Sequence, residues 1–392
     1  MIKKATYAIW GKDIDPAAVS QMDDAVSLKV AVKGALMPDA HMGYGLPIGG
    51  VLAVKDAVIP YAVGVDIACR MKLSVLAIPF SEYEAHKQIF RQALETQTKF
   101  GVGESFSRKR QHCVMDEDWD FSRIVGSLRD TAHKQLGTSG SGNHFAEFGK
   151  LSMIREDIGF PPGDYIAFLT HSGSRGTGAQ IADHYSTLAK RLHPELGRPL
   201  NNLAWLDMKT GDGVEYFKAM ELMGRYASAN HEIIHDAVLA FIGETALFTI
   251  ENHHNFAWKE NIGQREVIVH RKGATPAGKG VLGIIPGSMA DPGYIVRGLG
   301  NENALRSAAH GAGRQMSRNA AMKQFTFKDL QDILHKKQIT LISAGLDEIP
   351  MAYKNIEDVM EQQKDLVEIV AKFEPKMVKM APPGRKKRKK RR

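Results

Sequence analysis

Short apolar runs alternate with longer amphipathic stretches along the 392-residue chain. Runs rich in β-branched and aromatic residues predict strands at 49–54, 71–78, 165–170, 246–251, 265–270 and 338–343. Apolar residues three and four positions apart predict helices at 81–97, 177–192, 213–242, 303–323 and 355–372. In the longest of these helices, Tyr216, Met220 and Met223 begin one buried face.

The order of these elements indicates one continuous domain over residues 1–380, of the α+β class. The chain contains neither a fixed-period repeat nor an internal linker. No G-x-G-x-x-G motif follows a predicted strand, so we expect neither a Rossmann nor a P-loop nucleotide site. The pattern does not determine the order of the strands.

The positive charge is concentrated at the C-terminus. Lys and Arg number 52 against 44 Asp and Glu, and residues 385–392 are all basic, so the rest of the chain has 44 of each and is neutral. Such a run repels itself and buries no apolar surface, which predicts a disordered basic tail over 381–392. Binding to polyanions is the favoured role, and an address signal or a merely solvated segment remain alternatives.

The composition is that of a globular protein, with 43% hydrophobic and 24% charged residues. No stretch approaches 18 uninterrupted apolar residues, and the first thirty residues carry charges throughout. We therefore expect a soluble, cytoplasmic protein without a membrane partner. A reducing compartment keeps Cys69 and Cys113 as thiols, so a cysteine with a role is a ligand or a nucleophile.

His, Cys and Asp occur inside glycine-rich apolar segments, which is the unusual feature of this chain. Five segments share this character, and a sixth resembles them: 37–45, 64–70, 140–145, 170–176, 252–256 and 309–314. Glycine lets the backbone turn sharply and approach a ligand, while a flanking strand holds the neighbouring polar side chain. This pattern is typical of the residues that contact a bound ion or substrate.

Asp66 and Cys69 are three residues apart, so a tight turn could direct both side chains to one point. Together with several imidazoles they would form a cation site, and a thiolate can bridge two ions. Alternatively, each His is a hydrogen-bonded core residue, Cys69 is a small buried hydrophobe and the glycines are turns. The joint occurrence of five segments favours the metal site. The other histidines are interpreted as core or surface residues, namely His86, His112, His133, His184, His193, His231, His235 and His335.

Seven motifs in one order resemble the RtcB family of RNA ligases, over about Pro38 to Lys379. They are P-D-A-H-M-G-Y-G-L-P-I-G-G (38–50), I-P-Y-A-V-G-V-D-I-A-C-R-M (59–71), G-S-G-N-H-F-A-E (140–147), H-S-G-S-R-G (171–176), H-R-K-G-A-T (270–275), I-P-G-S-M (285–289) and H-G-A-G-R (310–314). The family joins a 3′-phosphate or 2′,3′-cyclic-phosphate RNA end to a 5′-hydroxyl end with GTP and manganese. The resemblance implies a short bacterial-type member, with mixed or antiparallel sheets and surrounding helices.

The resemblance assigns two Mn²⁺ ions to Asp66, Cys69, His144, His171 and His254, with the cysteine bridging. Of the adjacent pair at 253 and 254, the second precedes an asparagine, as in the family's H-N pattern. Ligand softness alone would favour zinc, so manganese follows from the resemblance only.

His310, in H-G-A-G-R, matches the family's catalytic nucleophile, which takes GMP from GTP. An RNA 3′-phosphate then displaces the histidine, and a 5′-hydroxyl attacks the guanylate-capped end and expels GMP. The nucleotide contacts implied are Asn143, Phe145, Glu147, Asn255, Ser288, Gly311, Ala312, Gly313, Tyr353 and Lys379.

Within that set, Asn143 and Asn255 would hold phosphate oxygens, Glu147 would accept hydrogen bonds from guanine, and Tyr353 would stack on the base. The family's C-terminal lysine, at 379 here, ends the chain against guanine. RNA or nucleotide phosphates would be gripped by Arg175, Arg314 and Arg318.

Two departures from the family pattern fall at the guanine end of the expected pocket. The chain continues past Lys379 as M-A-P-P, and Gly293 replaces a serine. A metal-dependent phosphoesterase that only opens cyclic phosphates and an RNA-binding protein with a vestigial pocket are the alternatives to a ligase. The complete set of ligands and nucleophile favours the ligase. The RNA substrate, the oligomeric state, the role of Cys113 and the need for an archease-type activator stay open.

Overall fold

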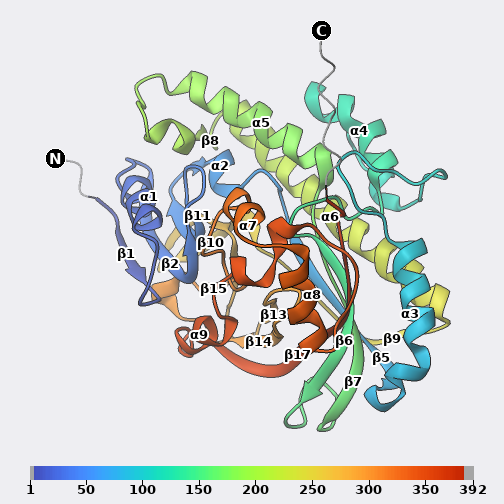
Figure 1. Ribbon diagram of the computed structural model, residues 1–392. Coiled ribbons are helices and arrows are strands. Elements are labelled where there is room, and N and C mark those ends of the chain that lie inside the picture. The colour runs from blue at the N-terminus through green and yellow to red at the C-terminus, as the bar shows by residue number, and fades with distance from the viewer. Residues whose placement is uncertain (1–3, 384–392) are drawn as a thin grey trace.

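Two β-sheets form the frame of the molecule, with helices packed around them (Figure 1). The computed structural model describes residues 4–383, so most of the predicted basic tail, including 385–392, lies outside the described residues. Residues 381–383 follow the last strand without regular structure.

The larger sheet has the strand order β13-β14-β17-β6-β7-β5-β9, with β16 paired to β17. All of its pairs are antiparallel except β16 with β17. Its strands are β5 (Arg70–Pro79), β6 (Phe145–Met153), β7 (Gly163–Ser172), β9 (Ala246–His253), β13 (Leu282–Ile285), β14 (Gly293–Gly298), β16 (Thr340–Ser343) and β17 (Val367–Met380).

The smaller sheet has the order β1-β2-β3-β11-β10, and only its β1–β2 pair is parallel. Its strands are β1 (Thr6–Ile9), β2 (Ala31–His41), β3 (Ile48–Val54), β10 (Asn255–Ile262) and β11 (Arg265–Lys272). Two short ribbons complete the strands, β4 (Ala57–Val58) with β8 (Leu206–Asp207) and β12 (Ala274–Pro276) with β15 (Ser307–Ala309). Mixed sheets in one α+β domain agree with the expected fold class.

Helices surround the sheets: α1 (Pro16–Val26), α2 (Pro60–Val63), α3 (Tyr83–Gln97), α4 (Arg123–Gln135), α5 (Arg175–Leu192), α6 (Gly211–Ile242), α7 (Arg318–Gln324), α8 (Phe327–Lys336) and α9 (Ile356–Glu361). Helices α3 and α6 pack on the larger sheet through a core that contains Phe90, Phe148, Phe168, Ile234 and Val238. In the part of the chain that the structure describes, no helix is long and apolar enough to cross a membrane.

The six predicted strands all coincide with observed strands, β3, β5, β7, β9, β11 and β16. The predicted helices at 81–97, 177–192 and 213–242 correspond to α3, α5 and α6. The buried face of α6 includes Tyr216, Met220 and Met223, as the spacing predicts. The spacing of apolar residues and the β-propensity were sufficient to predict these elements, because each of them buries one continuous face.

Two predicted helices are wrong. The 303–323 segment contains a 3₁₀ turn at Glu302–Ala304, then strand β15, then an irregular loop and only then α7. A continuous helix cannot form here, because Leu305 and Arg306 take left-handed backbone angles and glycines follow. In the 355–372 segment, α9 ends at Glu361 and β17 begins at Val367. Pairing of β17 with β6 and β14 outweighs the local helical spacing.

Candidate active site

Four neighbouring strands bring four predicted metal ligands to one edge of the larger sheet. The order there is β6-β7-β5-β9, and all three pairings are antiparallel. Because antiparallel neighbours alternate in direction, the start of one strand lies beside the end of the next. His144 and Cys69 immediately precede β6 and β5, whereas His171 lies near the end of β7 and His254 follows β9.

The predicted ligands form an unbroken series of contacts. Asp66 Oδ2 lies 3.0 Å from His144 Nε2, which lies 3.4 Å from Cys69 Sγ. Cys69 Sγ lies 3.1 Å from His171 Nε2, and that nitrogen lies 3.3 Å from His254 Nε2. The structure therefore brings together all five residues that the family resemblance assigns to a metal site.

Asp66 reaches this centre from the turn between α2 and β5. The backbone N–H of Ser174 donates to Asp66 Oδ1 at 3.1 Å. A Cβ atom at Gly173 would lie 2.3 Å from the same oxygen, so only glycine permits this approach. The H-S-G-S-R-G motif thus supplies both a predicted ligand, His171, and the backbone that holds another, Asp66.

The outer ring nitrogens of two histidines are fixed by backbone carbonyls. His144 Nδ1 donates to Ser139 O at 2.6 Å, and His171 Nδ1 donates to Asn143 O at 3.0 Å. Each Nε2 therefore faces Cys69 Sγ. Such carbonyl partners are typical of metal-binding histidines, because they set the tautomer and the ring orientation.

The charges of the buried donors fit a cation. Burial lowers the pKa of His171 and His254 well below the usual value, so both are neutral acceptors. Burial and the nearby Asp66 carboxylate raise the pKa of the Cys69 thiol, so a thiolate there needs a neighbouring cation. Burial opposes ionisation of Asp66, but His144 and Arg175 outweigh it and lower the Asp66 pKa to about 2. One sulfur, one carboxylate and three imidazoles are a plausible ligand set for a divalent metal ion.

His310 lies directly beside this centre. Its ring centroid is 5.0 Å from that of His254. Asp39 Oδ2 accepts from His310 Nδ1 at 2.6 Å and from the His310 backbone N–H at 3.2 Å. With its Nδ1 proton held by a fully buried carboxylate, the imidazole presents the Nε2 lone pair. This arrangement suits a nucleophile.

A local irregularity places Asp39 there. Strand β2 pairs with β3 as far as Leu36 and again at His41, and Asp39 lies in the shifted stretch between. Lys354 Nζ holds this stretch by donating to Pro38 O and Ala40 O, at 3.0 and 3.1 Å. On the other side, a Cβ at Gly313 would lie 2.2 Å from Asp39 O, so glycine is required at 313.

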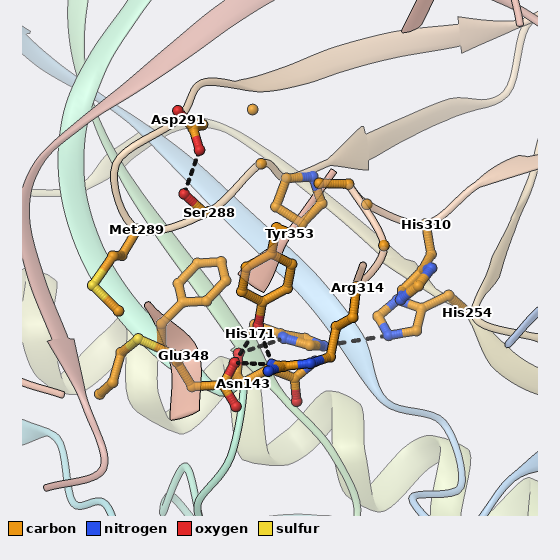
Figure 2. Close-up of a pocket in the computed structure, with 18 of the residues that line it drawn as sticks. Asn143, His171, His254, Ser288, Met289, Asp291, His310, Arg314, Glu348 and Tyr353 are labelled. Carbon is orange, nitrogen blue, oxygen red and sulfur yellow. Dashed lines mark hydrogen bonds and ion pairs between the residues drawn. The ribbon is translucent and has the colours of Figure 1, made fainter. Parts of the chain in front are cut away.

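A cavity of about 290 Å³ opens beside His310 and the metal ligands (Figure 2). His310 and His254 lie at one end of it in that view, and Ser288 and Asp291 lie well away from them. Of the predicted nucleotide contacts, the following line the cavity: Asn143, Phe145, Glu147, Ser288, Gly311, Ala312, Gly313 and Tyr353. Gly293, the position that departs from the family pattern, also lines it.

Charged groups fix the wall around Tyr353. The Tyr353 hydroxyl donates to the buried Glu348 carboxylate, and Arg314 donates to that carboxylate at 3.1 Å. Arg318 donates to Glu348 and, at 2.7 Å, to Asp347. Both arginines line the cavity, but each already pairs with a carboxylate. A phosphate-binding role for Arg314 and Arg318 stays a prediction.

Glu147 differs from the other acidic groups in the cavity. It is 4% exposed, and burial raises the pKa of its carboxyl well above the usual value. No side chain within residues 4–383 donates a hydrogen bond to it, so it remains available to a ligand. Ser288 Oγ, in contrast, already donates to Asp291 at 2.5 Å.

Three predicted residues lie outside this cavity. Lys379 Nζ donates to the carbonyls of Leu94 and Thr98 at the end of α3, at 2.7 and 3.0 Å, which places its ammonium away from the cavity. The neighbouring Met380 lines the cavity instead.

Asn255 and Arg175 also face other surroundings. The Asn255 side chain joins two backbone segments, donating to Asp66 O and accepting from Gly273 N, at 3.3 and 2.8 Å. Arg175 lies 3.2 Å from the His144 ring and lines a different hollow, together with Asp66 and His144.

Sequence analysis did not assign roles to Asp39 and Glu348. Asp39 had a detectable signal, since it stands in a glycine-framed segment of the same kind as the metal ligands. Glu348 had none, because its role arises only when Arg314, Arg318 and Tyr353 meet in three dimensions.

The other histidines fit the core or surface interpretation where their contacts are known. The imidazoles of His231 and His235 both hydrogen-bond to Thr170 Oγ1, at 2.8 and 2.9 Å. His253, next to the ligand His254, stacks on Trp258 with ring centroids 5.0 Å apart.

Fold and site together define an α+β protein with a Cys/His cluster that could hold a metal ion and an acid-paired histidine beside a cavity. The family model described as "tRNA-splicing ligase RtcB" matches residues 21–380. The chain belongs to the RtcB family.

Among its relatives, the RNA-splicing ligase RtcB of Escherichia coli strain K12 is 33% identical over 94% of this chain and 95% of its own length. The tRNA-splicing ligase RtcB of Thermococcus kodakarensis is 30% identical over 87% of this chain and 86% of its own length. RNA-splicing ligase RtcB homolog 2 of Entamoeba dispar is 28% identical over 92% of this chain and 83% of its own length.

Proposed function

We propose that this protein is an RNA ligase that joins 3′-phosphate or 2′,3′-cyclic-phosphate ends to 5′-hydroxyl ends, using GTP and two Mn²⁺ ions. One observation carries the proposal: His310 is paired with Asp39, contacts the ligand His254 and opens into a cavity lined by the expected nucleotide contacts. The names of the relatives agree with this function.

The five donors Asp66, Cys69, His144, His171 and His254 would hold the cations. When bound, such ions neutralise the charge that develops on phosphoryl oxygens and lower the pKa of a water molecule that can open a cyclic phosphate. Cys69 lies between His144 and His171 in the donor series and would supply the bridging thiolate.

In the first step, His310 Nε2 attacks the α-phosphorus of GTP. The N–P bond forms as the bond to the β-phosphate oxygen breaks, and pyrophosphate leaves with that electron pair. Asp39 keeps the proton on Nδ1 and stabilises the positive charge that the ring acquires. The product is a histidine–GMP phosphoramidate.

In the second step, an oxygen of the RNA 3′-phosphate attacks the same phosphorus, and the N–P electron pair returns to His310. In the third step, the 5′-hydroxyl attacks the RNA phosphorus, loses its proton and expels GMP. Asn143 lines both the nucleotide cavity and the hollow next to it, and it would contact phosphate oxygens during these transfers.

GTP would lie with its base toward Tyr353 and Glu147. The Tyr353 ring offers a stacking surface fixed by Glu348. Glu147 would accept hydrogen bonds from the N–H groups on the guanine edge, and adenine lacks that pair of donors. Lys379 is not part of this proposal, because its ammonium is bound to the end of α3.

The remaining parts of the proposal follow from the family resemblance alone. They are a catalytic unit over residues 1–380 and an activator of the archease kind.

The test is a joining assay with purified protein, Mn²⁺ and a pair of short RNAs. We expect GTP-dependent product from a 3′-phosphate strand and a 5′-hydroxyl strand, and none when the ends are 3′-hydroxyl and 5′-phosphate. ATP in place of GTP should give less product, because adenine offers a carboxylate at Glu147 one N–H donor group where guanine offers two adjacent ones.

One result of this assay would overturn the proposal. Opening of a cyclic phosphate without any joined RNA or covalent GMP, with or without an activator, would make the protein a phosphoesterase. Chelation of the metal should abolish joining, and readdition of Mn²⁺ should restore it.

A further inference from the structure

A second hollow leads from the protein surface to the catalytic centre. It is lined by His310, by the proposed metal donors Cys69 and His254 and by the buried Lys272, and the exposed Tyr44 lies at its outer part. It is separate from the nucleotide cavity, although Asn143 and His310 line both. The proposed reaction needs a path of this kind, because RNA must reach a phosphorus whose other side is occupied by the nucleotide.

The rim of this hollow exposes apolar side chains. Met42, Tyr44 and Val65 are 62%, 72% and 47% exposed. Exposed apolar groups clustered around an opening are typical of a binding surface. An accessible tyrosine ring at such a site can stack on a base, whatever the base.

The backbone that carries Tyr44 is held in place on several sides. Gln21 accepts from Gly43 N–H at 2.9 Å and donates to Gly43 O at 2.6 Å. Lys272 Nζ, on β11, donates to Tyr44 O. The exposed ring therefore projects from a fixed loop, so little order has to be gained when a ligand binds.

Beyond Tyr44 the surface continues into a further hollow whose polar lining includes Arg198, Asn201 and Asn202, together with one acidic residue, Asp24. Arg198 is exposed, and it forms no ion pair with any residue in the described range 4–383. A stacking ring followed by a cation and two amides suits a single nucleic-acid strand, whose bases stack while its phosphates meet the cation.

The order of the proposed reaction steps indicates which of the two RNA strands lies on this surface. In the proposed mechanism the 3′-phosphate must attack the phosphorus on His310, so its strand needs a surface that reaches His310. The neighbouring hollow that contains Arg175 shares Asp66 and His144 with this one, but His310 does not line it.

We infer that the surface from His310 past Tyr44 to Arg198 binds the RNA strand that carries the 3′-phosphate, with Tyr44 stacked on one of its last bases. This inference rests on the proposed function. In the step it serves, a phosphate oxygen forms the new P–O bond, the N–P bond breaks and the electron pair returns to His310.

The experiment separates this step from the others. Enzyme is first loaded with labelled GMP, freed of GTP, and mixed with a subsaturating single-stranded RNA that ends in a 3′-phosphate. We expect Tyr44→Ala to slow transfer of GMP to the RNA about tenfold, as loss of one base stack predicts. Tyr44→Phe should transfer at the wild-type rate, and neither variant should change self-guanylylation by GTP.

A direct binding measurement accompanies the kinetics. A 3′-phosphate RNA with 2-aminopurine in its last nucleotides should lose fluorescence on binding wild-type protein and keep it on binding Tyr44→Ala. Arg198→Gln should weaken RNA binding and reduce the slope of log affinity against log salt by about one. The matched control is Val102→Ala, which shortens a side chain that is 88% exposed in the neighbouring hollow and should leave GMP transfer unchanged.

Two results would overturn the inference. One is wild-type transfer by Tyr44→Ala. The other comes from the final joining step, measured with RNA already capped with guanylate and with varied concentrations of the 5′-hydroxyl strand. If Tyr44→Ala is defective only in that step, the surface binds the 5′-hydroxyl strand instead. If wild-type protein forms no covalent GMP and no joined RNA, the proposed function itself fails, and the fluorescence measurement still tests the surface.

Discussion

The two sides of the site are built in different ways. The metal-ligand edge, formed by the ends of β5, β6, β7 and β9, has donors that are fixed by strand register and backbone hydrogen bonds. The wall of the nucleotide cavity around Tyr353 is irregular, and side-chain pairs between Glu348 and the two arginines hold it.

This difference predicts how each side of the site responds to substitution. An edge positioned by four paired strands tolerates the loss of one ligand side chain without losing its shape. A wall positioned by one buried carboxylate changes shape when that carboxylate is altered. We therefore expect substitutions at the edge to affect chemistry, and substitutions at the wall to affect both nucleotide affinity and stability.

The largest expected effect comes from the adjacent pair His253 and His254. His254→Ala removes a metal donor and should reduce covalent labelling by GTP about 1000-fold, since a metal ion supplies several kcal/mol of charge stabilisation. His253→Ala removes packing on Trp258 and Phe256 and should stay within about twofold of wild type, at a cost of about 1 kcal/mol of stability. Equal activity of the two variants would break the distinction between ligand and neighbour.

Cys69→Ala should show the same loss of labelling with little change in the folded state. The side chain is small, so its removal costs about 1 kcal/mol in the metal-free protein. Circular dichroism and thermal melting in chelator check the fold, and titration with Mn²⁺ checks the loss of metal affinity. Wild-type labelling by this variant would contradict its place in the centre of the donor series.

The next effect concerns Asp39, the positioning residue of the nucleophile. Asp39→Asn keeps the size of a fully buried side chain but removes the negative charge that holds the His310 Nδ1 proton. We expect self-guanylylation at saturating GTP to slow about 100-fold, with the KM for GTP nearly unchanged. A rise in KM without loss of rate would show that Asp39 acts on binding instead.

Glu348→Gln tests the wall. Arg314, Arg318 and Tyr353 would lose their common carboxylate, so we expect the KM for GTP to rise about tenfold while the rate at saturation changes less than twofold. The free energy of unfolding should fall by about 1–3 kcal/mol, as for other buried partners left unpaired. Denaturant melts of this variant and of His254→Ala, compared in chelator, should show the larger loss in Glu348→Gln.

The smallest expected effect is a change in how the stability of the protein depends on pH, and it comes from Glu147. Burial raises its folded pKa, so the folded state binds its proton more tightly than the unfolded state does. This group therefore makes wild-type stability fall as the pH rises from the unfolded pKa to the raised folded value. Glu147→Gln should remove that decline and raise the melting temperature at pH 7 by about 1–3 °C, while GTP labelling weakens. A variant that melts lower at pH 7 would contradict this account.

The sequence predicted much of the metal edge because its information is local. His171 and His254 adjoin strands that β-branched and aromatic residues made recognisable, and glycines marked the neighbouring turns. His144 precedes β6, a strand that the sequence pattern did not predict. Their convergence could not be derived from the pattern, because it depends on the strand order β6-β7-β5-β9. The family resemblance supplied that information instead.

The wall was predicted less well, for a physical reason. Residues 303–323 and 355–372 have helical spacing, but long-range pairing of β15 with β12 and of β17 with β6 overrides it. Lys379 was expected to contact the guanine base, but its ammonium binds the end of α3. Side chains alternate in direction along β17, so the neighbouring Met380 faces the cavity instead. Glu348 acts only through partners that are distant in sequence.

The central claim is that His310 carries GMP beside the metal edge. The direct test is to incubate the protein with Mn²⁺ and GTP, digest it at a pH that preserves phosphoramidates, and locate the added GMP by mass spectrometry. We predict one adduct, on the peptide that contains His310, and none in His310→Ala. An adduct on Lys272 or on any other residue, or its persistence in His310→Ala, would contradict the account.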